Sequence, residues 1–231
     1  MPAQVLRQAE AYLQDLAAWE GRWFVLPAAE ELAPTGDPGE THEPSPAEAL
    51  RLFEQQICQC TRCCLSQSRT RFVFGTGDPQ AGILFIGEGP GQEEDLQGEP
   101  FVGPAGQLLD RIIGAMGMRR DQVYIANMVK CRPPGNRDPS PDELEACRPY
   151  LDRQIEIIRP RVICTLGRIA AQALLSSAAP LGRLRGRLHS YRGIPVVCTY
   201  HPAALLRSPE YKRPTWEDIK LLRRQYDGVE L

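Results

Sequence analysis

Asparagine and lysine are scarce in this chain of 231 residues. It has only two asparagines, Asn127 and Asn136, and three lysines against 24 arginines. Both asparagines lie in the segment NMVKCRPPGNRDP (residues 127–139), which also holds Cys131. An amide carries a donor and an acceptor at one tip, which suits it to reading the edge of a nucleobase. This segment is therefore a candidate recognition loop.

Long hydrophobic runs are also missing. The longest apolar stretch lies around residues 83–86, far short of the roughly 20 residues that cross a bilayer. The N-terminus is amphipathic, without the basic region and apolar core of a secretory signal. We therefore expect a cytoplasmic protein with no membrane partner. In that compartment the eight cysteines indicate metal ligands and buried thiols, because thiols there stay reduced.

The net charge of −2 hides a split along the chain. Residues 1–50 carry two arginines and nine acidic residues, and we expect them to form an acidic extension with a helix over 3–19 and a linker over 27–46. Residues 51–231 are expected to form the folded domain. Within it, residues 183–224 hold ten basic and three acidic residues. This stretch is either a surface for phosphates or a solvated face in an arginine-rich chain.

Strand and helix patterns alternate through the domain. Strands are expected at residues 82–87, 123–126, 161–166 and 194–199, and helices at 46–58, 105–116, 141–158, 167–176 and 215–226. This alternation predicts an α/β fold, with a parallel sheet covered on both faces. Ligands of such sheets bind beyond the carboxyl ends of the strands. Here those ends carry GEGPG (residues 87–91), Asn127 and His201.

Four cysteines have a spacing that suits a metal centre. They are Cys60, Cys63, Cys131 and Cys147. Four thiolates satisfy either zinc or an iron–sulfur cluster, and the spacing does not separate the two. Cys164 and Cys198 lie in apolar strands and are expected to be buried thiols. Cys58 and Cys64 are alternative ligands.

Three segments near strand ends carry candidate ligand contacts. GEGPG is not the GxGxxG dinucleotide fingerprint, but it permits close backbone approach. Phe101 is either a core residue or a platform on which a base stacks. His201 is either part of a strand-to-helix turn or a donor to developing negative charge. In the second case, the residues after His201 would form a wedge that fills the gap left in the base stack when a base is extruded. The wedge residues are Leu205, Leu206 and Arg207.

Six segments between residues 60 and 224 form a series: CTRC, FGTGDP, GEGPGQEEDLQGEPFVGPAGQLL, NMVKCRPPGNRDP, RPRVICTLG and TYHPAALLR. In this order they resemble the family-4 uracil-DNA glycosylases, the iron–sulfur branch of the uracil-DNA glycosylase superfamily. The resemblance implies a monomer with a three-layer α/β/α fold around a four-stranded parallel sheet. It also implies a structural [4Fe–4S] cluster, bound by Cys60, Cys63, Cys131 and Cys147. Residues 1–50 lie outside it and have no assigned function or partner.

The resemblance further implies a DNA repair enzyme that hydrolyses the N-glycosidic bond of uracil in single- and double-stranded DNA, leaving an abasic site. The target nucleotide must be flipped out of the stack. By resemblance, Asn127 reads the uracil edge and Phe101 stacks on the ring. Glu94 closes the pocket against the methyl group of thymine. His201 stabilises the departing uracil anion, an effect of about 3 kcal/mol for one well-placed donor.

One position differs from other branches of the superfamily. Where those branches carry an aspartate that positions water, this chain has Gly89. Glu88 and Asn136 are the candidates for handling the water. A branch that becomes trapped covalently on DNA has a basic, histidine-containing insertion after the third cysteine. This chain has PPGNRDP there, so we expect turnover.

Two other interpretations stay open. The first is a relative of the superfamily that binds DNA or a polymerase without cleaving, although GEGPG, Asn127, Asn136 and His201 are all in place. The second is a zinc-stabilised α/β module with no role in nucleic-acid chemistry.

Overall fold

The structure is a computed structural model, and it describes residues 43–228. The expected helix over residues 3–19 and most of the linker lie outside these residues. The folded part belongs to a compact unit that starts at Pro44. Helix α2 (Pro46–Ile57) opens this unit, capped by the Ser45 hydroxyl, which accepts a hydrogen bond from the Glu48 N–H at 3.2 Å. The division of the chain at residue 50 stays a prediction.

A single six-stranded sheet runs through the described unit. Its strands are β1 (Thr76–Gly77), β2 (Ile83–Gly87), β3 (Tyr124–Asn127), β4 (Val162–Leu166), β5 (Leu188–Tyr191) and β6 (Ile194–Thr199). They lie in the order β1-β3-β2-β4-β6-β5. The central β3, β2, β4 and β6 are mutually parallel, which confirms the expected four-stranded parallel sheet. Two antiparallel edge strands, β1 and β5, extend it.

The remaining elements are helices and short 3-10 turns. The helices after α2 are α3 (Gln92–Gln97), α4 (Pro104–Ala115), α5 (Pro141–Ile158), α6 (Arg168–Leu175), α7 (Leu181–Leu184), α8 (Pro202–Arg207) and α9 (Lys212–Asp227). The 3-10 turns are η1 (Cys64–Gln67), η2 (Arg120–Gln122), η3 (Pro134–Asn136) and η4 (Pro209–Tyr211). Helix α5 begins at a capping box in which Ser140 and Glu143 bond each other's backbone N–H groups.

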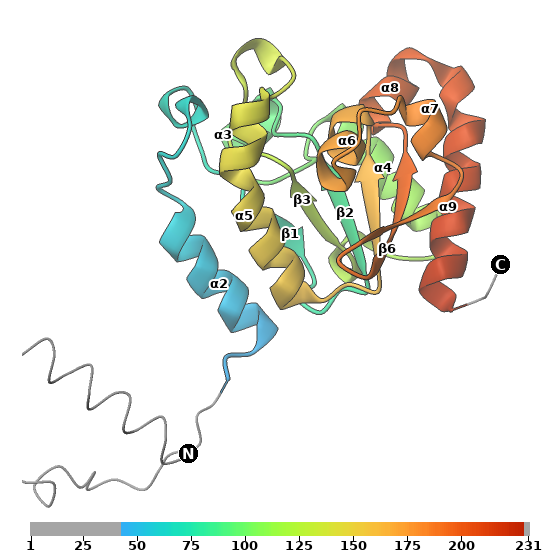
Figure 1. Ribbon diagram of the computed structural model, residues 1–231, viewed down its shortest axis with the longest axis horizontal. Coiled ribbons are helices and arrows are strands. Elements are labelled where there is room, and N and C mark those ends of the chain that lie inside the picture. The colour runs from blue at the N-terminus through green and yellow to red at the C-terminus, as the bar shows by residue number, and fades with distance from the viewer. Residues whose placement is uncertain (1–42, 229–231) are drawn as a thin grey trace, which may run out of the picture. The chain divides into compact units, whose positions relative to one another are not determined.

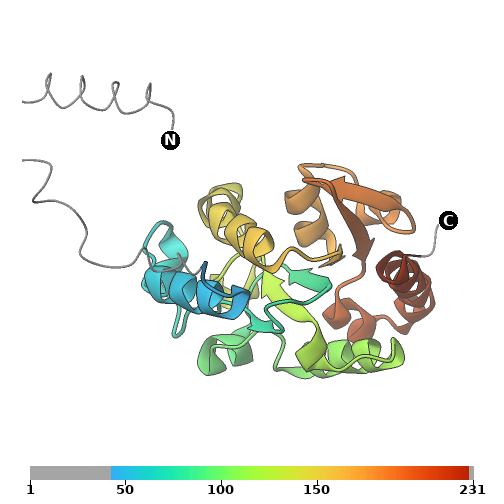
Figure 2. The same ribbon diagram turned by 90° about the horizontal axis from the view of Figure 1, so that it is seen from below.

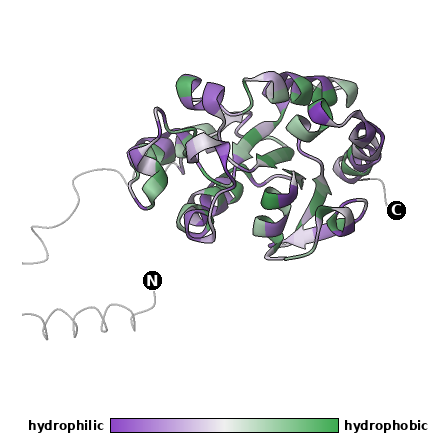
Figure 3. Ribbon diagram, turned by 90° about the horizontal axis from the view of Figure 1, so that it is seen from above, coloured by the Kyte–Doolittle hydropathy of each residue, from purple (hydrophilic) through white to green (hydrophobic). Residues whose placement is uncertain are grey.

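The helices cover both faces of the sheet, which confirms the three-layer α/β/α fold (Figures 1 and 2). Helices α2, α5, α6 and α7 pack on one face, where alternate strand residues such as Leu84 and Ile86 point. Helices α4 and α9 pack on the other, against Ile83, Phe85 and their neighbours. Because both faces are buried, the central strands are mostly hydrophobic, whereas the helices mix hydrophobic and hydrophilic residues (Figure 3).

The four parallel strands end at the same edge of the sheet, the upper edge in Figure 1. Gly87 ends β2, Asn127 ends β3, and Thr199 ends β6 just before His201. The expected functional segments therefore meet at this edge. No helix among residues 43–228 is both long and apolar enough to cross a membrane.

Candidate active site

Asn127 and Phe101 converge over Gly87. Gly87 and Asn127 are register partners at the ends of β2 and β3. A Cβ added at Gly87 would collide with Asn127 Oδ1, and it would lie 2.7 Å from Cε2 and Cζ of Phe101. Only glycine leaves room for both side chains. The Asn127 side chain is buried, and its Oδ1 has no hydrogen-bond partner within the described residues. A buried acceptor without a partner is costly and indicates a ligand contact.

The Phe101 ring lies against the imidazole of His201. Their ring centroids are 5.4 Å apart and the planes are inclined by 29°. Phe101 itself is buried and has a left-handed backbone, with a φ of 55°. Gly106 packs so closely on its carbonyl group that no side chain fits there. The loop before α4 is thus shaped to present the ring at the strand ends.

His201 is held as a neutral hydrogen-bond donor. It caps α8, and its Nδ1 accepts a hydrogen bond from the Ala203 N–H at 3.1 Å. Nδ1 therefore has no proton, and in the neutral ring the proton lies on Nε2. Burial, with a smaller contribution from Arg207 and against the attraction of Glu94, lowers the pKa of His201 to about 4. At neutral pH the ring offers an uncharged N–H.

Glu94 connects the glycine loop to the loop that carries Phe101. One carboxylate oxygen accepts from the Gly91 N–H at 3.1 Å. The other accepts from Val102 N–H at 3.0 Å and from Gly103 N–H at 3.1 Å. These three hydrogen bonds connect the glycine loop to the loop that carries Phe101. The expected contact of Glu94 with a thymine methyl group stays a prediction.

Glu88 sits beside an ion pair at the same edge. Arg168 Nη2 lies 2.6 Å from Oδ2 of Asp138. Burial raises the pKa of Glu88 to about 7, with Asp138 adding to the increase and Arg168 opposing it. The neighbouring Gly89 leaves no space for a side chain, because an added Cβ would lie 2.7 Å from Val129 Cγ2. An aspartate there would require Val129 to move.

Asn136 lies apart from the buried side chains. It is exposed in η3 with a φ of 55°, and its Oδ1 accepts a hydrogen bond from Arg132 Nε at 2.8 Å. Its amide oxygen is thus engaged within its own loop. Its expected role in handling water stays a prediction.

The four expected cysteine ligands lie in one region of the fold. Cys131 and Cys147 are buried in a small cluster with Leu65 and Val129, and Cys63 packs against it. Burial is the main cause of the raised pKa values of Cys131 and Cys147. Cys63 and Cys60 add to the rise for Cys131, and Cys131 and Cys63 add to it for Cys147, so the thiols are close enough to influence one another.

Two of these sulfurs, those of Cys60 and Cys131, each accept a hydrogen bond from a side chain. The Tyr150 hydroxyl donates to Cys60 Sγ at 3.1 Å, and Arg69 Nη1 donates to Cys131 Sγ at 3.2 Å. Such donors stabilise thiolates. The other two candidates point elsewhere: Cys64 donates to Glu143 Oε1 at 3.1 Å, and Cys58 donates to Gln55 O at 3.5 Å. Across residues 43–228, no three Cys, His, Asp or Glu side chains are grouped closely enough to hold one metal ion.

Comparison with known proteins identifies the family. The sequence model of the uracil DNA glycosylase superfamily matches residues 74–220. The chain is similar to the type-4 uracil-DNA glycosylase of Archaeoglobus fulgidus, with 43% identity over 75% of this chain and 91% of the relative. The type-4 uracil-DNA glycosylase of Sulfurisphaera tokodaii is 45% identical over 76% of this chain and 84% of the relative. That of Thermotoga maritima is 44% identical over 75% of this chain and 92% of the relative.

The chain belongs to the uracil DNA glycosylase superfamily, in its type-4 branch. Membership confirms the resemblance found in the sequence motifs. The matched region contains every pocket residue described above.

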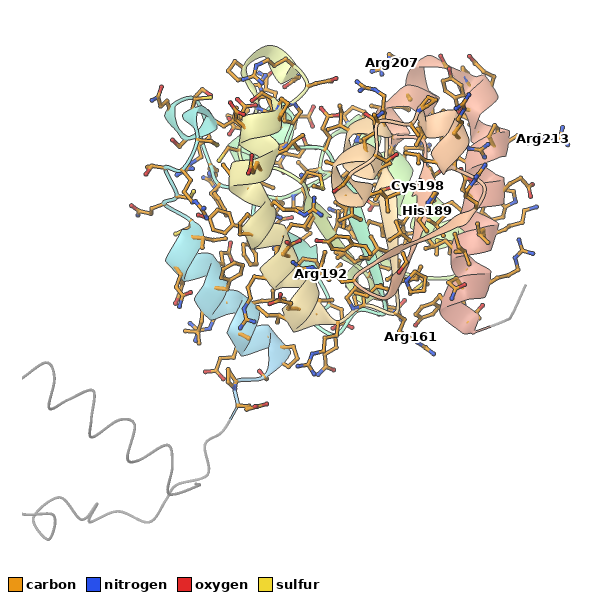
Figure 4. All side chains as sticks on the ribbon, in the orientation of Figure 1. Arg161, His189, Arg192, Cys198, Arg207 and Arg213 are labelled. Carbon is orange, nitrogen blue, oxygen red and sulfur yellow. The ribbon has the colours of Figure 1, made fainter. Side chains whose placement is uncertain are left out.

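In this type-4 chain the expected wedge is divided between core and surface. Leu205 is 3% exposed, within helix α8, which packs on α4. Leu206 is 47% exposed and Arg207 is exposed as well. Figure 4 places Arg207 at the upper edge, where the parallel strands end. Leu206 is thus the apolar side chain of the three that reaches the surface.

Sequence reasoning missed one residue of this type-4 site, the buried Lys130. Its Nζ donates to the Asn127 carbonyl at 3.0 Å and to Gln154 Oε1 at 2.6 Å. Gln154 Nε2 in turn donates to the Phe74 carbonyl at 3.0 Å. Burial lowers the pKa of Lys130 to about 8. The network ties Asn127 to helix α5, which carries Cys147. The signal was available, because lysine is one of the scarcest residues in the chain.

Proposed function

We propose that this protein is a DNA repair enzyme that hydrolyses the N-glycosidic bond of uracil in DNA and leaves an abasic site. The observation that carries the proposal is the meeting of three groups at one sheet edge: the unpartnered Asn127 Oδ1, the Phe101 ring and the neutral His201. The relatives named type-4 uracil-DNA glycosylase support the same conclusion.

Asn127 selects uracil by its hydrogen-bonding edge. Uracil presents an N3–H donor beside the O4 acceptor. The free Oδ1 of Asn127 accepts from N3–H, and its amide N–H donates to O4. Cytosine presents the opposite pattern, so its edge leaves buried polar groups unpaired, which is costly. The Phe101 ring stacks on the extruded base.

His201 stabilises the leaving group. When the bond between C1′ and N1 breaks, its electron pair stays on uracil, and negative charge develops on N1 and on the carbonyl oxygens of the base. The Nε2–H of a neutral His201 donates to that charge without giving up its proton, so it acts as a fixed electrostatic donor. The low pKa of His201 supports this role, because the ring needs no deprotonation at neutral pH.

Glu88 handles the water in this proposal. The ionised carboxylate accepts a proton as the water oxygen bonds to C1′. A half-buried carboxylate with a pKa of about 7 has the strength that suits a general base near neutral pH. The substrate is uracil in either single- or double-stranded DNA. In a duplex, the exposed Leu206 fills the space left by the extruded base.

We further propose that Cys60, Cys63, Cys131 and Cys147 bind a structural [4Fe–4S] cluster. Each thiolate of such a cluster binds its own iron atom, so the site needs no three sulfurs grouped around one ion. The donors on Cys60 and Cys131 and the buried cluster of Cys131 and Cys147 fit this group. When bound, the cluster cross-links the chain before η1, the loop after β3 and helix α5.

Excision from a labelled oligonucleotide with one uracil tests the activity. We expect an alkali-sensitive abasic site at uracil and none at thymine in a matched strand. Failure of the intact, iron-containing protein to cleave either strand context would refute the proposal and favour a non-catalytic DNA binder.

A further inference from the structure

Helix α9 carries an exposed tryptophan among cations. Trp216 is 42% exposed. Lys212 and Lys220 lie one turn on either side of it, and Arg213 is three residues before it, so all share one face of the helix. These four residues, together with Arg224, are exposed and are here called the α9 basic face. Two of the three lysines in the chain belong to it.

The four cations of this face outnumber the Glu217 carboxylate that lies among them, whose pKa is lowered by Lys220, Arg213 and Arg224. Lys220 pairs with Glu217 at 2.8 Å. No carboxylate among residues 43–228 forms an ion pair with Lys212, Arg213 or Arg224. Exposure of a large aromatic side chain to water is unfavourable, so an exposed tryptophan indicates a binding surface. Surfaces that bind single-stranded nucleic acid combine such aromatic side chains with neighbouring lysines and arginines.

The face begins beside the active site. Tyr211, which precedes α9, stacks on Tyr200 with ring centroids 4.3 Å apart, and Tyr200 directly precedes His201. Arg185 binds the Pro214 carbonyl at 2.5 Å and pairs with the buried Asp218 at 3.0 Å. The tyrosine pair joins the start of α9 to the residue before His201, and Arg185 joins the first two turns of α9 to the end of α7. Figure 4 shows Arg213 on the same upper side as Arg207, with Arg161 at the opposite edge.

We infer that the α9 basic face binds single-stranded DNA that runs from the active site, with an unpaired base stacked on Trp216. Phosphates fit the lysines and arginines, and the exposed indole fits a base that has no complementary partner. In a duplex the bases are stacked within the helix and present no free ring to Trp216. The inference rests on the proposed function only in its choice of DNA as the ligand.

Tryptophan fluorescence tests the stacking directly. The chain has three tryptophans, and Trp19 and Trp23 lie outside the described residues. In the full chain with Trp19→Phe and Trp23→Phe, Trp216 is the only indole. We expect a uracil-free oligothymidylate to quench its emission saturably at low salt, and a matched duplex to quench it less. Trp216→Ala should weaken binding of the single strand by about fivefold or more.

Two matched arginine variants distinguish binding of DNA at the α9 basic face from a general effect of positive charge on DNA binding. Arg213→Gln should weaken binding and reduce the salt slope by about 0.7, the value for one lost phosphate contact on a single strand. Arg161→Gln also removes one positive charge, but at the opposite edge of the molecule, where Arg161 has no ion pair within the described residues. This variant should change neither the affinity for the single strand nor the salt slope.

Absence of quenching, equal quenching by the duplex, or equal losses in the two arginine variants would each overturn the inference. Because the oligothymidylate contains no uracil, the result is independent of catalysis. Normal excision without quenching would refute the α9 basic face alone. Quenching without excision would refute the proposed function and leave this binding surface in place.

Discussion

His201 is the residue at which local geometry decides the chemistry. Its Nδ1 is occupied by the Ala203 N–H, so only Nε2–H is available to a ligand. We expect His201→Ala to lower the single-turnover rate of uracil excision by about 10²- to 10³-fold, the loss typical of one oxyanion donor. A decrease below tenfold would show that His201 does not stabilise the leaving group.

The low pKa of His201 also predicts an effect on stability. Folding lowers the pKa of this imidazole from about 6.5 to about 4. Between these values the unfolded chain binds more protons than the folded one, so the contribution of His201 to the free energy of unfolding decreases as the pH falls from 6.5 to 4. A His201→Gln variant should lose this part of the acid dependence in thermal melts.

Glu88 should set the pH dependence of the rate. If its ionised form accepts the proton of water, excision rises with pH around a midpoint of about 7, the pKa of this carboxyl group. Asp138→Asn removes a repelling charge and should move the midpoint to lower pH. Arg168→Gln removes an attracting charge and should move it to higher pH. A single-turnover pH profile that is unchanged in Glu88→Gln would exclude Glu88 as the base.

At the scale of elements, the active site depends on how loops are fastened to strand ends. Asn127 ends a strand and is in register with Gly87 of β2, whereas Phe101 lies in a loop whose position depends on the carboxylate of Glu94. Stability and pocket geometry are therefore linked through this one side chain.

Removal of that carboxylate should cost both stability and activity. Glu94→Ala leaves three backbone N–H groups without their acceptor. We expect a loss of about 1–3 kcal/mol in the free energy of unfolding and, at about 2–4 °C per kcal/mol for a chain of this size, a melting temperature lower by roughly 2–12 °C. Excision should fall as well, because the Phe101 loop is released. Glu99→Ala, an exposed change in the same segment, serves as the control for calorimetry and should melt like the parent protein.

At the scale of the whole molecule, the cysteines join segments that are distant in sequence. Cys147→Ser should lose iron and the visible absorption of a cluster, and it should melt at a lower temperature, because three segments lose their cross-link. Cys64→Ser should retain iron, since its thiol is bonded to Glu143. Iron analysis of the two purified variants makes the comparison. Equal iron in both would show that Cys147 is not a ligand.

Much of the architecture follows from patterns that are local in sequence. The central strands are mostly apolar, and the caps at Ser45 and Ser140 mark helix starts within one turn. The edge strands escaped prediction for physical reasons. Strand β1 has two residues, and β5 (LHSY) is half-exposed without clear alternation, so neither carries a hydrophobic signal.

The sequence alone determined the α/β class, the order of the central elements, the family and the candidate ligands, because periodicity and motif spacing depend on neighbouring residues. Only the tertiary structure decided which groups act together. The placement of Asn127 and Phe101 over Gly87 depends on the register of β2 and β3 and on a separate loop. The donor state of His201 and the burial of Lys130 likewise depend on contacts across the fold, which no local pattern encodes.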